Sequence, residues 1–190
     1  MAGAGRHLTA EEKQRGLFEH FLGWDTLAVV VPKTNPVTSL TLEQLRGIFA
    51  GDLTNWKSAG GPDQAIVVLS APKGSGVRSA VQDLILKERG FTPQEVVSAV
   101  VAQADQQLSM FPGAITAVSL SMVDNQQAKT VAVNGVEPTA DNVLSKRYPL
   151  IKPLALVTRG QPQGALAKFI VLAKGVRGKQ ILNKRFVAAP

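Results

Sequence analysis

The chain contains no cysteine. This absence excludes disulfide bonds, thiolate metal sites and cysteine nucleophiles, and it is compatible with any redox compartment. Histidine is almost as scarce, since only His7 and His20 occur, thirteen residues apart and without an evident third ligand. A metal site is therefore not expected, and no motif connects either histidine to a glycine-flanked serine as a catalytic triad would require. We expect no catalytic residue, no metal and no cofactor.

Long apolar runs are also missing. Residues 1–16 lack an apolar core of the length that a signal peptide needs, and no later run is long enough to span a bilayer. We therefore expect the chain as given to be soluble, with any export signal removed or not included.

Charge favours an anionic partner. The chain carries a net charge of +7 and has a pI near 9.9, which attracts anions over long range. Nucleic acid, an acidic surface and a small oxyanion would all fit this charge. The basic residues are scattered, however, and two tryptophans and one tyrosine offer few platforms on which bases could stack. Nucleic acid is therefore not expected as a partner.

The order of predicted elements indicates an α/β architecture. Apolar, β-branched runs predict strands, and amphipathic stretches with caps predict helices. The predicted strands are 27–31, 66–69, 114–119, 130–133, 154–157 and a terminal pair at 186–187. The predicted helices begin after Thr9, after Thr41, at 77, at Pro93, at Pro162 as the first helical residue, and near Lys179. The first two have capping-box spacing, with Glu12 three residues after Thr9 and Gln44 three residues after Thr41. The stretch from Pro93 runs through Val96, Val97 and Val100. Alternating strands and helices predict mainly parallel strand pairing.

The most informative unit is a glycine loop between the predicted strand 66–69 and the helix that follows it. Gly74-Ser75-Gly76 lies where this helix begins, and a helix N-terminus offers backbone N–H groups and a partial positive charge to an anion. Ser75 adds a hydroxyl donor, and Lys73 and Arg78 add positive charge nearby. Taken alone, such a loop is more often a tight turn with a helix cap than a binding site. It is not a Walker A motif, which disfavours nucleotides.

Five segments in order resemble one family. They are LAVVVPKTNPVTSLTLEQLRGIFAGDLTNWKSAGG, IVVLSAPKGSGVRSAVQDLIL, PGAITAVSLS, VNGVEPTADNVLSKRYPL and ALVTRGQPQGALAKFIVLAKGVRGKQIL. The most specific signatures are Asn55-Trp56 and Tyr148-Pro149-Leu150. Together these segments resemble the periplasmic phosphate-binding protein family, the PstS-like substrate-binding proteins of phosphate ABC transporters.

The resemblance implies a fold and a function. It implies a type 2 periplasmic-binding-protein-like fold, in which two αβ lobes joined by crossing strands close over a dehydrated oxyanion. Residues 1–35 plus 147–190 would form a partial lobe 1, and residues 36–146 would form lobe 2 with the glycine loop. The first βαβ portion of lobe 1, with which the family opens, is missing. By resemblance the protein binds phosphate or a related oxyanion without chemistry, outside the cytoplasm, with an ABC transporter permease as a possible partner.

The chain also departs from the family. Family members carry an arginine where this chain has Ala71 and commonly a threonine where it has Val77. The ligand-binding residues that carry over are Gly74, Ser75, Gly76, the backbone N–H of Val77, and Arg6 as a possible contact.

Two further readings remain open. One is a truncated relative that acts as an interaction or regulatory domain with weak or no phosphate binding. The other is that the missing portion reflects only where the given sequence starts. An exposed sheet edge left by that portion predicts a homo-oligomer.

Overall fold

A computed structural model describes residues 1–97, 107–108, 110–123, 126 and 128–190. The chain divides into two compact units: unit 1 comprises Met1–Thr26 and Ile151–Pro190, and unit 2 comprises Leu27–Leu150. The boundaries fall at 26/27 and 150/151 rather than at the expected 35/36 and 146/147. The difference arises because residues 27–32 pair with strands of unit 2 and because Tyr148 donates a hydrogen bond to the carbonyl oxygen of Leu27.

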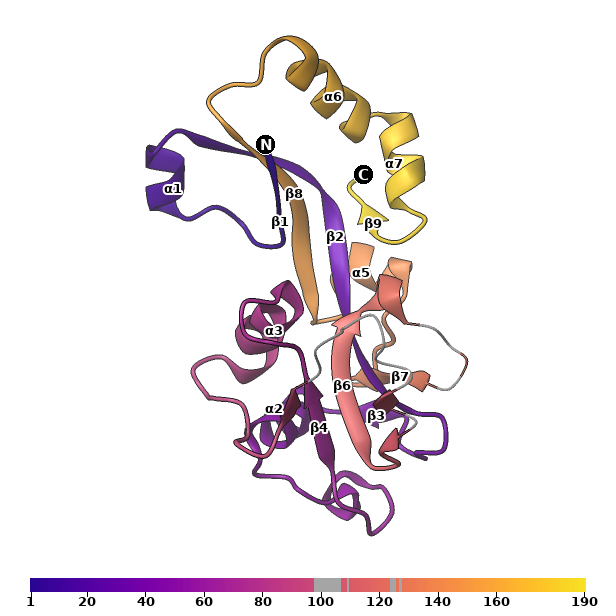
Figure 1. Cartoon of the computed structure of the whole chain (residues 1–190). Coiled ribbons are helices and arrows are strands. Elements are labelled where there is room, and N and C mark those ends of the chain that lie inside the picture. Colours follow the sequence, from indigo (N-terminus) through magenta and orange to yellow (C-terminus); the bar gives the residue numbers. More distant parts are fainter. Residues whose placement is uncertain (98–106, 109, 124–125, 127) are drawn as a thin grey trace. The chain divides into compact units, whose positions relative to one another are not determined.

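Unit 1 contains an antiparallel sheet in the order β1-β8-β2-β9 (Figure 1). Its strands are β1 (Ala2–Ala4), β2 (Leu17–Pro32, of which 17–26 belong to unit 1), β8 (Ile151–Arg159) and β9 (Val187–Ala188). At Gly23 the backbone of β9 passes so close that a Cβ atom would lie 2.2 Å from the carbonyl oxygen of Val187. A glycine is therefore required where these two strands meet.

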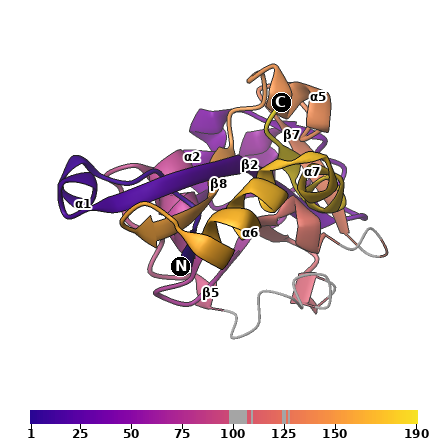
Figure 2. The same cartoon turned by 90° about the horizontal axis from the view of Figure 1, so that it is seen from above.

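Three helices complete unit 1. They are α1 (Ala10–Gln14), α6 (Gly164–Lys174) and α7 (Val176–Leu182) (Figure 2), and residues 183–186 connect α7 to β9. The predicted capping box at Thr9 is confirmed, because its side chain accepts from the backbone N–H of Glu12 and the Glu12 carboxylate accepts in return. Pro162 is not the first helical residue as predicted. Gln163 still has an extended backbone, so the helix begins at Gly164.

The sheet of unit 2 has the strand order β5-β4-β6-β2-β7-β3. The strands are β3 (Ser39–Leu40), β4 (Val67–Ser70), β5 (Val96–Val97), β6 (Ala114–Ser119) and β7 (Ala128–Val133), together with residues 27–32 of β2. Only the β4–β5, β4–β6 and β3–β7 pairs are parallel among the described residues. The prediction of mainly parallel pairing was wrong, because β2 pairs antiparallel with β6, β7, β8 and β9.

Short helices connect the strands of unit 2. They are α2 (Leu42–Ala50), η1 (Trp56–Ala59), α3 (Gly76–Val81), the π-helical turn η2 (Gln82–Leu86), η4 (Leu120–Met122) and α5 (Ala140–Leu144). The capping box predicted at Thr41 and Gln44 is present, and Gly51 ends α2 in the left-handed conformation. The helix η2 continues α3 without a break and packs beside α2.

The helix predicted from Pro93 is wrong at Val96 and Val97, which form strand β5 beside β4. Thr92 initiates a turn here, since its carbonyl oxygen accepts from the N–H of Glu95. Pairing with the buried strand β4 thus overrides local helix propensity. Val100, the last residue of that prediction, lies outside the described residues.

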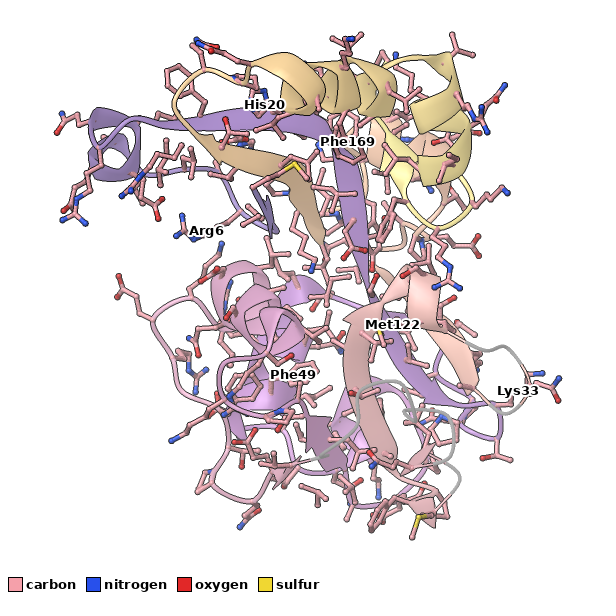
Figure 3. The ribbon with its side chains drawn as sticks, turned by 45° about the horizontal axis from the view of Figure 1, so that its top comes forward. Arg6, His20, Lys33, Phe49, Met122 and Phe169 are labelled. Carbon is pink, nitrogen blue, oxygen red and sulfur yellow. The ribbon has the colours of Figure 1, made fainter. Side chains whose placement is uncertain are left out.

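Three residues of the family signature, Trp56, Tyr148 and Leu150, lie in the core of unit 2. Trp56 is fully buried, and its indole N–H donates to the carbonyl oxygen of Gly113 at 2.9 Å. Tyr148 is also fully buried, and this burial raises the pKa of its phenol. Phe49 of α2 is buried in the same unit (Figure 3). These aromatic side chains stabilise the fold and are covered from solvent.

Asp25 is a buried aspartate with a basic partner on the neighbouring strand. It is 6% exposed and faces Lys152 directly across the β2–β8 pair, with 3.0 Å between the carboxylate oxygen and Nζ. A buried carboxylate requires a partner, and the sequence separation of the two residues concealed this one.

Candidate anion-binding site

The predicted glycine loop is built as expected, between a buried strand and a helix. Strand β4 ends at Ser70, the chain turns through Pro72–Ser75, and α3 begins at Gly76. The turn is closed by a hydrogen bond from the N–H of Ser75 to the carbonyl oxygen of Pro72 at 3.1 Å. Gly74 has a φ of 86°, a backbone conformation that side chains disfavour, so this glycine is required by the turn itself.

The loop presents an open face to solvent. Gly74 and Gly76 are exposed, and a Cβ atom at either position would meet nothing within 4 Å. As the first residues of a helix, Gly76, Val77 and Arg78 have no acceptor for their N–H groups in a preceding turn. Of these three N–H groups, only that of Val77 has a hydrogen-bond partner among the described residues, the Oγ of Ser75 at 3.2 Å. The backbone N–H groups of Gly76 and Arg78 therefore remain as donors for a ligand.

Ser75 acts as the helix cap and keeps a proton to donate. Its Oγ accepts from Val77, whereas a hydroxyl group can also donate one hydrogen bond. Two expectations are thus refined. Ser75 remains a candidate ligand residue, while the Val77 N–H must leave the Oγ of Ser75 before it can bind an anion.

The two basic residues at the loop differ in role. Lys73 is exposed at the turn. Arg78, in contrast, forms an ion pair with Glu95 in which both side chains are only 14% exposed. Burial alone raises the pKa of Glu95, but hydrogen bonds from Arg78 and Ser70 and the charges of Arg78 and Lys73 outweigh it, so the pKa is lowered overall. Arg78 is therefore neutralised within the protein, and Lys73 is the loop's exposed cation.

Arg6, the remaining predicted contact, belongs to unit 1 (Figure 3). Its guanidinium holds the carboxylate of Glu12 through two hydrogen bonds of 2.8 and 2.7 Å. These hydrogen bonds are the main reason that the pKa of Glu12 is lowered to about 2. The structure thus brings Gly74, Ser75, Gly76 and Val77 together in one loop and places Arg6 in a different ion pair.

The described residues contain no cluster of three or more side chains that could hold a metal ion. Within that same part of the chain, no helix is both long and apolar enough to cross a bilayer.

Sequence reasoning missed the partners of Arg78. Glu95 and Phe91 contact its guanidinium, which lies 3.9 Å from the centre of the Phe91 ring. The segment that carries both residues was predicted as loop and helix, and no spacing in the sequence relates it to α3. The β4–β5 pairing brings the two segments together in the fold.

Fold and loop together describe an α/β protein with an exposed glycine loop at a helix N-terminus. Residues 1–175 match the family described as "PBP superfamily domain". The chain therefore belongs to the PBP superfamily, and the family resemblance and fold class inferred from sequence are confirmed.

Individual relatives are described as phosphate receptors. One solved structure, described as a phosphate ABC transporter substrate-binding protein from Clostridium perfringens with bound phosphate, is 35% identical with a TM-score of 0.88, over 99% of this chain and 78% of that one. The phosphate-binding protein PstS of Borreliella burgdorferi is 26% identical over 97% of this chain. PstS of Bacillus subtilis is 28% identical over 85% of this chain. The chain spans 70% and 55% of the lengths of these two curated relatives.

Proposed function

We propose that this protein is a solute-binding protein that takes up phosphate or a related oxyanion at the loop Gly74–Val77, without chemistry. The observation that carries the proposal is the open face of that loop, where two helix-terminal N–H groups have no partner among the described residues. Backbone N–H groups at a helix N-terminus are suited to a tetrahedral oxyanion because they converge on one point and carry partial positive charge. The relatives described above as phosphate-binding support the choice of anion.

The loop by itself offers few donors. It contributes the N–H groups of Gly76 and Arg78, the hydroxyl of Ser75 and the charge of Lys73, whereas Ala71 supplies no side-chain donor. A buried phosphate needs its hydration shell replaced by protein donors, since an unpaired buried charge is strongly unfavourable. We therefore propose that unit 2 is the lobe that carries the anion loop and that tight binding requires donors beyond those of the loop itself.

Calorimetric titration tests this function. We expect saturable 1:1 binding of phosphate and weaker or no binding of chloride. Ser75→Ala should weaken phosphate binding by roughly tenfold or more, because a hydrogen bond to a charged group is lost. Ser79→Ala is the matched control, since Ser79 is exposed on the same helix but outside the loop. No heat from either phosphate or sulfate at millimolar concentration would refute the proposal and favour the interaction-domain alternative, which the relatives do not support.

We further propose an extracytoplasmic location and an ABC transporter permease as the partner. Both proposals rest on membership of the family alone. The test is co-purification with the permease of the same organism in the presence and absence of phosphate. Recovery of the complex supports the proposal, and its absence under both conditions counts against it.

We also propose that unit 1 mediates self-association. Helices α6 and α7 leave large apolar side chains exposed, and β1 leaves an open sheet edge. The exposed residues are Phe169, Val171, Leu172, Val176 and Ile181. Light scattering should show a dimer or larger species that Leu172→Gln weakens. The control Leu144→Gln, on α5 of unit 2 with similar exposure, should change nothing. A monomeric wild-type protein would contradict this proposal.

A further inference from the structure

Arg78 occupies an unusual position directly behind the glycine loop. It is the third residue of α3, and its Nη1 lies 3.1 Å from the Oγ of Ser70, 3.1 Å from the carbonyl oxygen of Ala71 and 2.9 Å from Oε2 of Glu95. Its Nη2 lies 2.7 Å from Oε1 of Glu95. The guanidinium thus donates two hydrogen bonds to the carboxylate of Glu95, and it also donates to Ser70 at the end of β4.

These contacts join both ends of the loop to one side chain. Ser70 and Ala71 precede the turn, and Arg78 itself belongs to the helix that follows it. Between these ends, the only backbone hydrogen bond within residues 72–75 is the one from Ser75 to Pro72. The loop is exposed and contains two glycines, so its own contacts constrain it weakly. Its geometry therefore depends on how firmly its ends are held.

The ring of Phe91 and the carboxylate of Glu95 fix the guanidinium in place. The centre of the guanidinium lies 3.9 Å from the centre of the ring, a distance that suits a cation–π contact. Glu95 immediately precedes β5, which pairs with β4. The segment 91–95 thereby holds the guanidinium of Arg78 through Phe91 and Glu95, in a largely buried setting.

We infer that Arg78, held by Glu95 and Phe91, is the positioning residue that sets the geometry of the anion loop Gly74–Val77. Its side chain acts through the loop ends and does not bind the anion, because Glu95 balances its charge and its terminal nitrogens bond Ser70, Ala71 and Glu95. Lysine cannot replace it, since a single ammonium lacks the planar fork that reaches these acceptors together. The expected effect of Arg78 on ligand affinity rests on the proposed function, whereas its expected effect on the order of the loop does not.

Amide hydrogen exchange in the ligand-free protein provides the first test. Arg78→Met should speed exchange of the two hydrogen-bonded loop amides, those of Ser75 and Val77, by roughly tenfold or more, because several hydrogen bonds to a charged group are lost. Arg78→Lys should restore little of the protection. The control is Arg46→Met, which removes a partly buried arginine that bonds the carbonyl oxygen of Ile85 at the other end of the same helical segment. This control should leave the loop unchanged.

Glu95→Gln is the second variant, in case Arg78→Met does not fold. It keeps the size of the side chain and removes the charge that holds Arg78, so it should also speed loop exchange. Unchanged exchange in the loop for the Arg78 and Glu95 variants would overturn the inference. An equal increase over the whole of unit 2, matched by the Arg46 control, would overturn it too, because the effect would then be general destabilisation.

Phosphate affinity separates this inference from the proposed function. If the wild-type protein binds phosphate, Arg78→Met should bind it roughly tenfold more weakly than Arg46→Met at equal thermal stability. Equal affinity of these two variants would overturn the inference as it applies to binding. If the wild-type protein binds no phosphate but Arg78→Met still loosens the loop, the proposed function fails while the positioning role stands.

Discussion

Replacing Gly76 by alanine separates folding from anion binding, because the two properties should change in opposite directions. Gly76 is the first residue of α3, it is exposed, and a Cβ atom there meets nothing within 4 Å. Its φ lies outside the left-handed region, so alanine fits without strain. A glycine-to-alanine change at such a position stabilises a protein by about 0.4–1 kcal/mol, mainly because the unfolded chain loses freedom.

Anion binding should respond to the same change with a loss. The added methyl group stands beside the N–H of Gly76, where the proposed phosphate rests. Losing one hydrogen bond to a charged group costs about 1.5–3 kcal/mol, which corresponds to a roughly ten- to hundredfold weaker affinity. Gly74 cannot serve for this test, because its φ of 86° would strain an alanine.

Urea unfolding and phosphate calorimetry on the purified variant measure the two effects. The control is Gly90→Ala, another exposed glycine of unit 2 that has open space at Cβ and a φ outside the left-handed region. It should leave the affinity unchanged. Unchanged phosphate affinity in Gly76→Ala would refute the view that the backbone of this loop holds the anion. A large loss of stability would refute the assignment of open space at its Cβ.

Three further predictions concern the scaffold. Tyr148→Phe should lower the free energy of unfolding by about 1–3 kcal/mol in urea, since the buried carbonyl oxygen of Leu27 loses its donor; no change would contradict the buried bond. Thr41→Ala should cost about 0.5–2 kcal/mol by the same assay, because the N–H of Gln44 loses its cap, and a cost below that range would indicate that α2 does not depend on this box. The folded pKa of Glu95 lies below its unfolded value, so its carboxylate stabilises the protein above that unfolded value, and this contribution disappears as the pH falls through the folded pKa. Acid titrations followed by circular dichroism should therefore show a smaller loss of stability between about pH 5 and pH 2 in Glu95→Gln than in wild type, and identical acid profiles would contradict the pairing.

Local signals in the sequence predicted local structure well. The capping boxes at Thr9 and Thr41 depend on residues three apart, and both are present. The strand 114–119 was predicted to the residue, because its whole run is buried and a glycine precedes it. The turn at Gly74 was likewise predictable, since glycine dipeptides with serine mark turns by their backbone freedom.

Features that depend on contacts between distant segments could not be predicted. The first half of β2, residues 17–26, contains charged and polar residues and becomes a strand through its pairing with β8. Val96 and Val97 become a strand through pairing with β4. The same pairing explains why Glu95 was missed as the partner of Arg78, and why Arg78 was expected to supply charge to a ligand. Sequence thus predicted the loop but not the side chains that support it.

The most direct test of phosphate binding at the glycine loop is a titration of the isotopically labelled protein, followed by the backbone amide resonances. The account predicts saturable shifts at Gly74, Ser75, Gly76 and Arg78 on addition of phosphate, and none of that size on addition of chloride. Saturable shifts confined to residues elsewhere in the chain, or none at millimolar phosphate, would contradict it.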